Sequence, residues 1–157
     1  MKRKERQVID KNDIINIIDS CDVCRLGFMD GNIPYIVPMN FGYEIKNESL
    51  IFYFHSAREG KKIDCIKNNP SACFEMDSSK KLIQADTACG YTMEYESIIG
   101  NGIIDFINNK TEKIKALDII MKKYAKVLSF EYNDNMLEKV MIFKLTAENY
   151  TGKRHKK

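Results

Sequence analysis

Two short turn sequences constrain the fold of this chain more than any other feature. The sequence DGN at 30–32 separates apolar segments at 23–29 and 33–45, and NES at 47–49 separates the second segment from a third at 50–54. Connections this short join antiparallel neighbours, because parallel strands need a crossover of about a dozen residues or more. The three segments therefore predict consecutive strands of an antiparallel sheet.

The remaining periodic segments extend this sheet and add helices. Pro34 and Pro38 lack a backbone donor, so the strand at 33–45 is expected to be bulged or to lie at a sheet edge. About six strands with few helices favour a mainly β protein, an antiparallel barrel with helices packed outside, over a doubly wound sheet. We expect further strands at 71–76, 91–107 and 140–145, a polar loop at 77–81, and helices at 13–20 (capped by Asp10 or Asn12), 59–68 and 112–125 (capped by Asn109).

Composition indicates one globular domain over residues 1–157, with short basic tails at 1–6 and 153–157. The formal net charge is only +3 and the basic residues are dispersed, which disfavours nucleic acid as a partner. No apolar run approaches the ~18 residues of a membrane span, and no apolar region follows the charged N-terminus as in a signal peptide. We therefore expect a cytoplasmic protein with no membrane partner.

The cysteines do not indicate a disulfide framework or a metal site. There are five, an awkward number for pairing, and Cys21 and Cys24 form the one closely spaced pair. A structural zinc site needs about four ligands, and no second pair is spaced to complete one. We expect free thiols and no metal, and a redox role for Cys21 and Cys24 stays open.

The segment IFYFHSAREGKK combines a capping signal with unexpected positive charge. Ser56 and Glu59 fit a capping box, which predicts a helix beginning at Ala57. Lys61 and Lys62 would then lie near the helix N-terminus, where cations are normally disfavoured. A bound phosphate would resolve this conflict, because free backbone N–H groups and cations both favour it. An exposed, solvent-screened basic helix start is the alternative.

His55 ends the strand that precedes this helix. Strand alternation places Ile51, Tyr53 and His55 on one face and Phe52 and Phe54 on the other, which we expect to be the core face. The imidazole therefore either lines a site beside Tyr53 or is a structural histidine at the sheet margin.

A second unusual segment is VPMNFGY. It places Asn40, a polar amide, within an apolar strand, and Gly42 lets another group approach the backbone closely. If it is buried, the amide needs hydrogen-bond partners, which a flat heteroaromatic ring or ordinary backbone groups could supply.

Four blocks in this order, CRLGFMDGNIPYIVPMNFGYE, IFYFHSAREGKKIDCIKNNPSACFEMD, GYTMEYESIIGNGII and the terminal TGKR, resemble one known family. It is the nitroimidazole-resistance (Nim) branch of the pyridoxamine 5'-phosphate oxidase-like flavoproteins. The resemblance implies a split antiparallel β-barrel, a homodimer with flavin mononucleotide (FMN) at the subunit interface, and two-electron redox chemistry at the flavin. It covers nearly the whole chain.

The resemblance also implies site residues. It places the ribityl-phosphate end of FMN at His55, Ser56, Lys61 and Lys62, the isoalloxazine ring beside Pro38, Met39 and Asn40, and a further contact at Ser97 and Ile98. His55 also matches the histidine near the ring that handles substrate. Two departures stand out: the chain ends in TGKRHKK rather than an Arg-x-His substrate motif, which argues against vitamin B6 oxidation, and Tyr91 replaces a tryptophan.

The resemblance therefore implies a flavin-dependent reductase of nitroaromatic compounds such as 5-nitroimidazoles. His55 would donate a proton or anchor the small-molecule substrate. The sequence lacks a Gly-rich dinucleotide fingerprint, so a nicotinamide donor would bind only transiently. Two alternatives remain: a haem-binding split-barrel protein with His55 as axial ligand, and a non-catalytic flavin-binding dimer.

Overall fold

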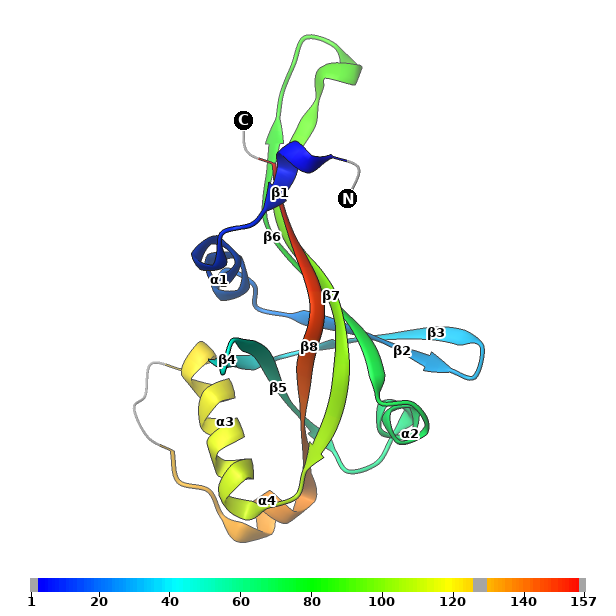
Figure 1. Cartoon of the computed structure of the whole chain (residues 1–157), viewed down its shortest axis with the longest axis vertical. Helices are drawn as coiled ribbons and strands as arrows, with labels where there is room; N and C mark the ends of the chain where they lie inside the picture. Colours follow the sequence, from blue (N-terminus) through cyan, green and yellow to red (C-terminus); the bar gives the residue numbers. More distant parts are fainter. Residues whose placement is uncertain (1–2, 126–129, 156–157) are drawn as a thin grey trace.

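The computed structural model describes residues 3–125 and 130–155 of the chain. Within them, one antiparallel sheet has the strand order β3-β2-β6-β7-β8-β5-β4, and β1 pairs with β8 (Figure 1). The strands are β1 (Gln7–Val8), β2 (Cys24–Asp30), β3 (Ile33–Met39), β4 (Gly42–Lys46), β5 (Ser49–Ala57), β6 (Ser71–Ile83), β7 (Thr92–Ile107) and β8 (Val140–His155). The helices are α1 (Lys11–Asp19), α2 (Lys61–Asn68), α3 (Lys110–Tyr124) and α4 (Asp134–Lys139), with 3-10 turns η1 (Lys4–Arg6) and η2 (Ala88–Gly90).

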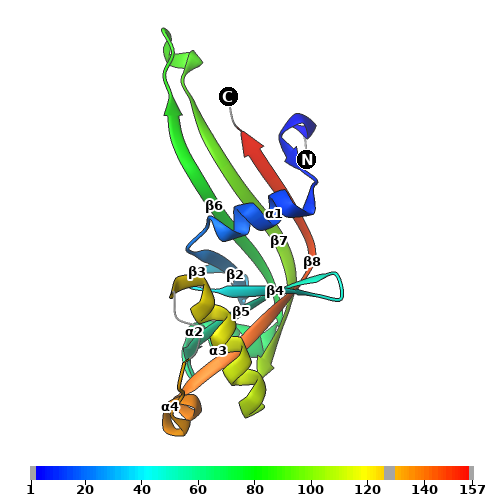
Figure 2. The ribbon, with the colours of Figure 1, turned by 90° about the vertical axis from the view of Figure 1, so that its left-hand side faces the viewer.

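The long strands β7 and β8 form the spine of the molecule, and the helices pack against the outside of the curled sheet. The β6–β7 hairpin extends beyond the rest of the chain (Figure 2). None of the helices in the described residues is long and apolar enough to cross a membrane.

Both hairpins expected from the turn sequences are present. Asp30 pairs with Ile33, and Lys46 pairs with Ser49. The backbone supports them with left-handed residues at Gly31 (φ 60°), Asn47 (φ 49°) and Glu48 (φ 64°). The antiparallel prediction is therefore confirmed by the local turn geometry.

The segment 33–45 is two strands rather than one. β3 ends at Met39 and β4 begins at Gly42, leaving Asn40 and Phe41 outside both ladders. β3 pairs with β2 and β4 pairs with β5, at opposite ends of the strand order. The edge position predicted from the prolines is confirmed. The prediction of a single strand over 33–45 is wrong, because the chain crosses from one edge of the sheet to the other between β3 and β4.

Two of the predicted helix caps are confirmed. The Asp10 carboxylate accepts hydrogen bonds from the N–H groups of Asn12 and Asp13, at 2.8 and 3.1 Å. The Asn109 side chain accepts one from the N–H of Glu112, at 3.1 Å. Each cap satisfies backbone donors that have no partner within the helix.

The predicted capping box at Ser56 is wrong. β5 stays paired with β8 up to Ala57, and α2 begins only at Lys61, with Gly60 as N-cap at φ 123°. The Ser56 hydroxyl donates to the Ala57 carbonyl at 2.8 Å instead of capping a helix. Pairing with β8 gives residues 56 and 57 ladder hydrogen bonds, and these keep the segment in the sheet despite its capping-box sequence.

Long-range pairing also lengthens two other elements. The predicted polar loop 77–81 lies within β6, which absorbs it with a register shift between Ser78 and Lys81. The strand expected at 140–145 continues to His155, so residues 153–155 are not a solvated tail. In both places the partner strand β7 continues, and a paired backbone is favoured over a solvated one. The sequence did not predict α4, and the described residues hold eight strands rather than about six.

The core lies inside the curled sheet and under α3. Phe52 and Phe54 point into the interior, as alternation predicted. Ile51 and Tyr53, on the opposite face of β5, pack with Ala116 of α3 in a second cluster. The most deeply buried phenylalanines of the interior are Phe41, Phe52, Phe54, Phe74 and Phe143.

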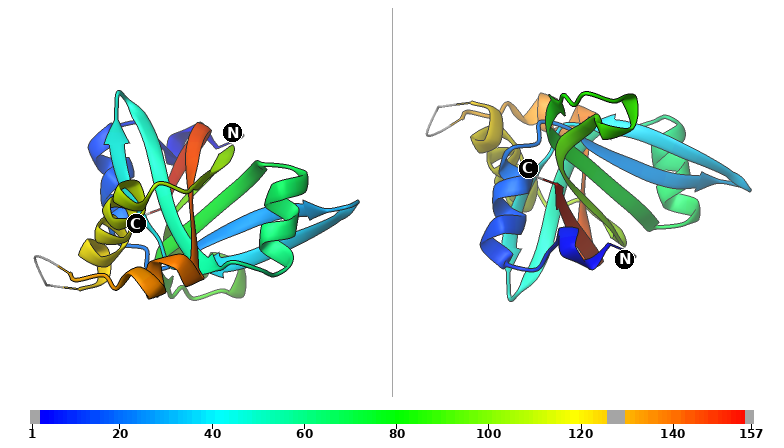
Figure 3. Two further views of the ribbon diagram at one scale, coloured as in Figure 1. Left: turned by 90° about the horizontal axis from the view of Figure 1, so that it is seen from below. Right: turned by 90° about the horizontal axis from the view of Figure 1, so that it is seen from above.

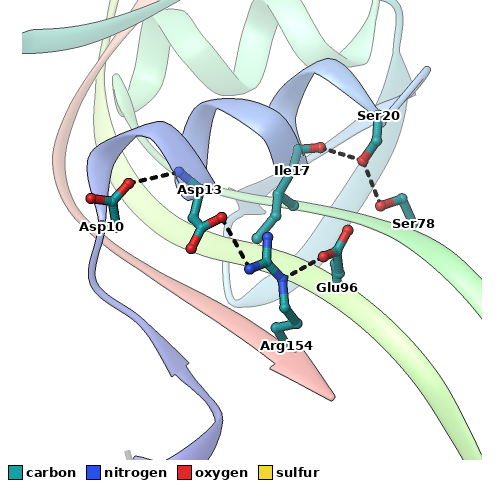
Figure 4. Close-up of polar contacts among 7 residues, drawn as sticks. All are labelled: Asp10, Asp13, Ile17, Ser20, Ser78, Glu96 and Arg154. Atoms are coloured by element: carbon teal, nitrogen blue, oxygen red, sulfur yellow. Dashed lines mark hydrogen bonds and ion pairs between the residues drawn. The ribbon is translucent and has the colours of Figure 1, made fainter. Parts of the chain in front are cut away.

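Helix α1 is tied to the sheet by polar contacts (Figure 4). The Arg154 guanidinium lies between Asp13 and Glu96, with its Nη1 atom 3.1 Å from the Asp13 carboxylate and its Nε bonded to Glu96. The hydroxyl oxygens of Ser20 and Ser78 are 2.7 Å apart. These contacts bind α1 to β6, β7 and β8, and they hold the end of β8 against the helix.

Candidate functional site

The end of β5 and the start of α2 form an exposed, cationic segment. His55 is exposed on the outer side of β5, Ser56 is half-buried, and Lys61 and Lys62 are the first two residues of α2. An added Cβ at Gly60 would meet no atom within 4 Å, so the space in front of the helix start is open. The four residues expected at the ribityl-phosphate end of FMN thus lie on the last residues of β5 and the first turn of α2.

The two lysines differ in their surroundings. The ammonium of Lys61 is 2.6 Å from the Asp30 carboxylate and 5.0 Å from the centroid of the Tyr35 ring. The hydrogen bond to Asp30 raises the pKa of Lys61 above its usual value. Lys62 is half-buried and has no ion-pair partner within the described part of the chain. The contact of Lys61 with Asp30 is possible because α2 lies beside the projecting β2–β3 hairpin (Figure 3).

The break between β3 and β4 lies at the same end of the sheet as His55. Gly42 pairs with Tyr53, and Asn40 and His55 each lie two residues beyond that pair. Asn40 is exposed, and its amide donates a long 3.4 Å hydrogen bond to the carbonyl of Asp22. The expectation that Asn40 lies within a strand is wrong, because it lies at the break between β3 and β4, where its side chain is exposed. Pro38 is exposed and Met39 is buried.

Ser97 and Ile98 lie elsewhere. Ser97 pairs with Lys153 and His55 pairs with Ile142, positions eleven residues apart on β8, or roughly 35 Å along the strand. Ile98 is fully buried in the core, which leaves only its backbone able to meet a cofactor. A single chain does not bring Ser97 and His55 together.

Ser97 and Pro38 instead share one exposed surface, which we call the outer sheet face. It consists of the side chains of β3, β2, β6, β7 and β8 that point away from the core, including one cross-strand row, Pro38, Arg25, Glu75, Ile99 and Thr151.

The outer sheet face carries several exposed apolar side chains beside its charged ones. Met29, Ile36 and Ile99 are 43%, 65% and 57% exposed. A shallow hollow of about 410 Å³, lined by residues such as Gly27, Ile36 and Cys73, lies among them. Contiguous apolar patches of this kind mark interaction surfaces.

The charged group on this face was not predicted from the sequence. Arg25 Nη1 lies 3.0 Å from the Glu75 carboxylate and 2.7 Å from that of Asp77. The available signal was alternation, because Arg25 stands between the buried Cys24 and Leu26, and Glu75 stands between buried apolar residues in the same way. Only the β2–β6 register shows that the two segments are adjacent.

The thiols of the chain are free. Cys21, Cys24 and Cys65 are buried, and Cys73 and Cys89 are exposed. Burial raises the pKa of the Cys21 thiol, and burial also raises the pKa of Cys24. Both thiols are therefore held in the protonated, unreactive form at neutral pH, which disfavours a redox role.

The donor set suits an anionic, aromatic cofactor. The first intrahelical bonds of α2 are donated by the N–H groups of Ile63 and Asp64, so those of Lys61 and Lys62 precede the helix ladder. Together with two ammonium groups and the open space at Gly60, they fit a phosphate. The exposed Asn40 amide can hydrogen-bond a heterocycle, and His55 can transfer a proton.

Comparison with known families identifies the family of this chain. A sequence profile of the family described as Pyridoxamine 5'-phosphate oxidase matches residues 10–154. The chain belongs to this family. Its fold is the family's split antiparallel β-barrel, as the sequence motifs predicted.

Several solved structures resemble this chain. A protein from Bacteroides thetaiotaomicron VPI-5482, provisionally assigned to 5-nitroimidazole antibiotic resistance, is 38% identical with a TM-score of 0.83, and the match covers 94% of this chain and 86% of that one. The flavocytochrome Anf3 from Azotobacter vinelandii (15% identity, TM-score 0.85, 100% and 72% covered) shares the fold. So does the FAD and haem binding protein from Mycobacterium smegmatis (12%, 0.81, 97% and 74%). A search of curated proteins found no match.

Arg154, near the C-terminus of this pyridoxamine 5'-phosphate oxidase family member, forms ion pairs within its own chain. Arg154, in the terminal TGKR, contacts Asp13 and Glu96, and only 24% of its side chain is exposed. A guanidinium engaged by two carboxylates is poorly placed to receive a substrate phosphate. This geometry adds to the sequence argument against vitamin B6 oxidation.

Proposed function

We propose that this protein is an FMN-dependent reductase of nitroaromatic compounds such as 5-nitroimidazoles. The observation that carries the proposal is the exposed His55 beside the cationic start of α2, in a chain 38% identical to a protein provisionally assigned to 5-nitroimidazole resistance. Bound FMN would supply the two-electron redox chemistry, and the protein would supply binding, orientation and protons.

The residues of the chain divide this work. Lys61, Lys62 and the free N–H groups of α2 bind the phosphate, and Pro38, Met39 and Asn40 line the ring. Conversion of a nitro group to a nitroso group takes two electrons and two protons and releases water. His55 lies at the same end of the sheet as Asn40 and donates a proton to the nitro oxygen.

We further propose a homodimer that binds flavin at the subunit interface, through the outer sheet face. Two observations support this arrangement: the apolar surface around Ile36 and Ile99 is exposed in the single chain, and Ser97 is too far from His55 to share a flavin within it. In a dimer, Ser97 and the backbone of Ile98 from one subunit complete the site formed by His55 and Lys62 of the other.

The proposed dimer interface can be tested by introducing one charged side chain. Ile36→Asp places a carboxylate on the outer sheet face, and because Ile36 is 65% exposed, the monomer fold should tolerate it. We expect analytical ultracentrifugation to show a dimer for the wild type and a monomer with reduced FMN occupancy for the variant. Ile45→Asp, at a 50% exposed position on β4, is the matched control and should remain dimeric. A wild-type monomer that still binds FMN would contradict the proposal.

The activity is tested by spectroscopy and single-turnover kinetics. We expect the purified protein, or the apoprotein after addition of FMN, to show the visible bands of oxidised flavin. After anaerobic reduction with dithionite, added 5-nitroimidazole should reoxidise the protein with loss of the nitro absorbance. A Soret band in place of flavin bands would favour the haem alternative, and flavin without nitro reduction would favour the non-catalytic dimer.

A further inference from the structure

The C-terminal end of α3 contacts the break between β3 and β4 directly. The Tyr124 hydroxyl accepts a hydrogen bond from the Phe41 N–H at 2.9 Å and donates one to the Asp22 carbonyl at 2.8 Å. Asn40 donates to the same Asp22 carbonyl. One hydroxyl therefore links the strand break to the segment between α1 and β2.

Two further contacts hold the break against this helix. A Cβ at Gly42 would lie 2.6 Å from backbone atoms of Ile119 and Ile120, so β4 and α3 are in backbone contact there. The Lys123 ammonium lies 4.7 Å from the centroid of the Phe41 ring and donates to the Ile18 carbonyl of α1 at 3.0 Å. Figure 1 shows the C-terminal end of α3 beside β4, where these contacts form.

The position of these contacts distinguishes them from ordinary helix packing. Asn40 and Phe41 belong to neither ladder, since β3 pairing ends at Met39 and β4 pairing begins at Gly42. Ladder hydrogen bonds therefore do not fix the backbone of Asn40. The Tyr124 hydroxyl takes the place of a ladder partner for Phe41, one residue from the exposed amide.

We propose that Tyr124 is a positioning residue for the flavin ring. Its hydroxyl sets the backbone of Asn40 and Phe41, and through it the placement of the Asn40 amide, which hydrogen-bonds the ring edge. The inference rests on the proposed FMN-binding function. Because hydrogen bonds to the ring edge change strength when the ring gains charge, Tyr124 influences the affinities for oxidised and reduced FMN unequally.

The test compares Tyr124→Phe with a matched variant on the same helix. The Tyr132 hydroxyl donates to Asp118 of α3 at 2.9 Å, so Tyr132→Phe removes one hydroxyl bond to α3 and leaves the strand break intact. For each variant we would measure the melting temperature, the dissociation constants of FMN and riboflavin, the visible band shape and the midpoint potential of bound FMN.

We expect Tyr124→Phe to weaken FMN and riboflavin equally, about tenfold, because the ring end is affected and not the phosphate. A tenfold difference between the oxidised and reduced states would shift the two-electron midpoint potential by about 30 mV. Tyr132→Phe should leave affinity, band shape and potential at wild-type values.

The outcomes separate this inference from the function on which it rests. If the wild type binds FMN and Tyr124→Phe changes only the melting temperature, as Tyr132→Phe does, Tyr124 is a packing residue and the inference is wrong. If the wild type binds no FMN under any condition, the proposed function fails and the inference with it.

Discussion

His55→Ala lowers the rate of 5-nitroimidazole reduction by about a hundredfold, while the fold and the FMN stoichiometry stay unchanged. The size is that of a lost proton-transfer group. The side chain is exposed at the end of β5 and takes no part in the core, so its removal should not disturb the structure. The measurement is the single-turnover reoxidation rate of the reduced protein across a pH series.

His155→Ala is the control for this variant, because His155 is the only other histidine in the sequence. Its ring nitrogen Nδ1 lies 2.8 Å from the carbonyl of Met93, on the β7–β8 ladder far from His55 of the same chain. We expect wild-type turnover for this control and the loss of turnover only in His55→Ala. Unchanged turnover in His55→Ala would make the histidine structural, and a lost Soret band would make it an iron ligand.

Lys62→Ala weakens FMN binding by about ten- to a hundredfold and leaves riboflavin binding nearly unchanged. A charge-assisted hydrogen bond to phosphate contributes roughly 1.5–3 kcal/mol to binding. Riboflavin lacks the phosphate and does not form this bond, so its affinity should not change. We expect a smaller effect for Lys61→Ala, because the Lys61 ammonium is also held by Asp30 at 2.6 Å and is only partly available to the cofactor. Fluorescence titration of the apoprotein with both ligands measures the difference.

Lys67→Ala is the matched control for these variants. Lys67 lies in the last turn of the same helix and is exposed, so the variant changes the net charge equally without touching the helix start. Its FMN affinity should equal that of the wild type. Equal losses of FMN and riboflavin in Lys62→Ala would show that the lysine stabilises the helix start and does not bind phosphate.

Features encoded within a few residues were predictable from the sequence. The turns at 30–32 and 47–49 determine their hairpins, because left-handed positions and tight connections leave antiparallel pairing as the outcome. Asp10 and Asn109 cap their helices through hydrogen bonds to backbone groups two or three residues away. Alternation along β5 also placed Phe52 and Phe54 in the core.

The tertiary structure decided wherever a local signal competed with a distant partner. Ser56 and Glu59 have the pattern of a capping box, but β8 holds residue 56 in the sheet and moves the start of α2 to Lys61. Residues 153–155 resemble a basic tail, yet the continuing strand β7 and the contacts of Arg154 with Asp13 and Glu96 keep them ordered. Such ladders depend on residues far apart in the sequence, which no local pattern reports.

The candidate site divides in the same way. His55, Lys61 and Lys62 are close in the sequence, so their motif alone identified a cationic segment with a histidine beside it. The separation of Ser97 from His55 along β8 came only from the strand register. So did the support of the strand break by Tyr124, 83 residues away from Phe41. The sequence alone determined which chemical groups the site contains, and the tertiary structure decided which of them meet, because strand pairing and helix packing set distances that local spacing does not.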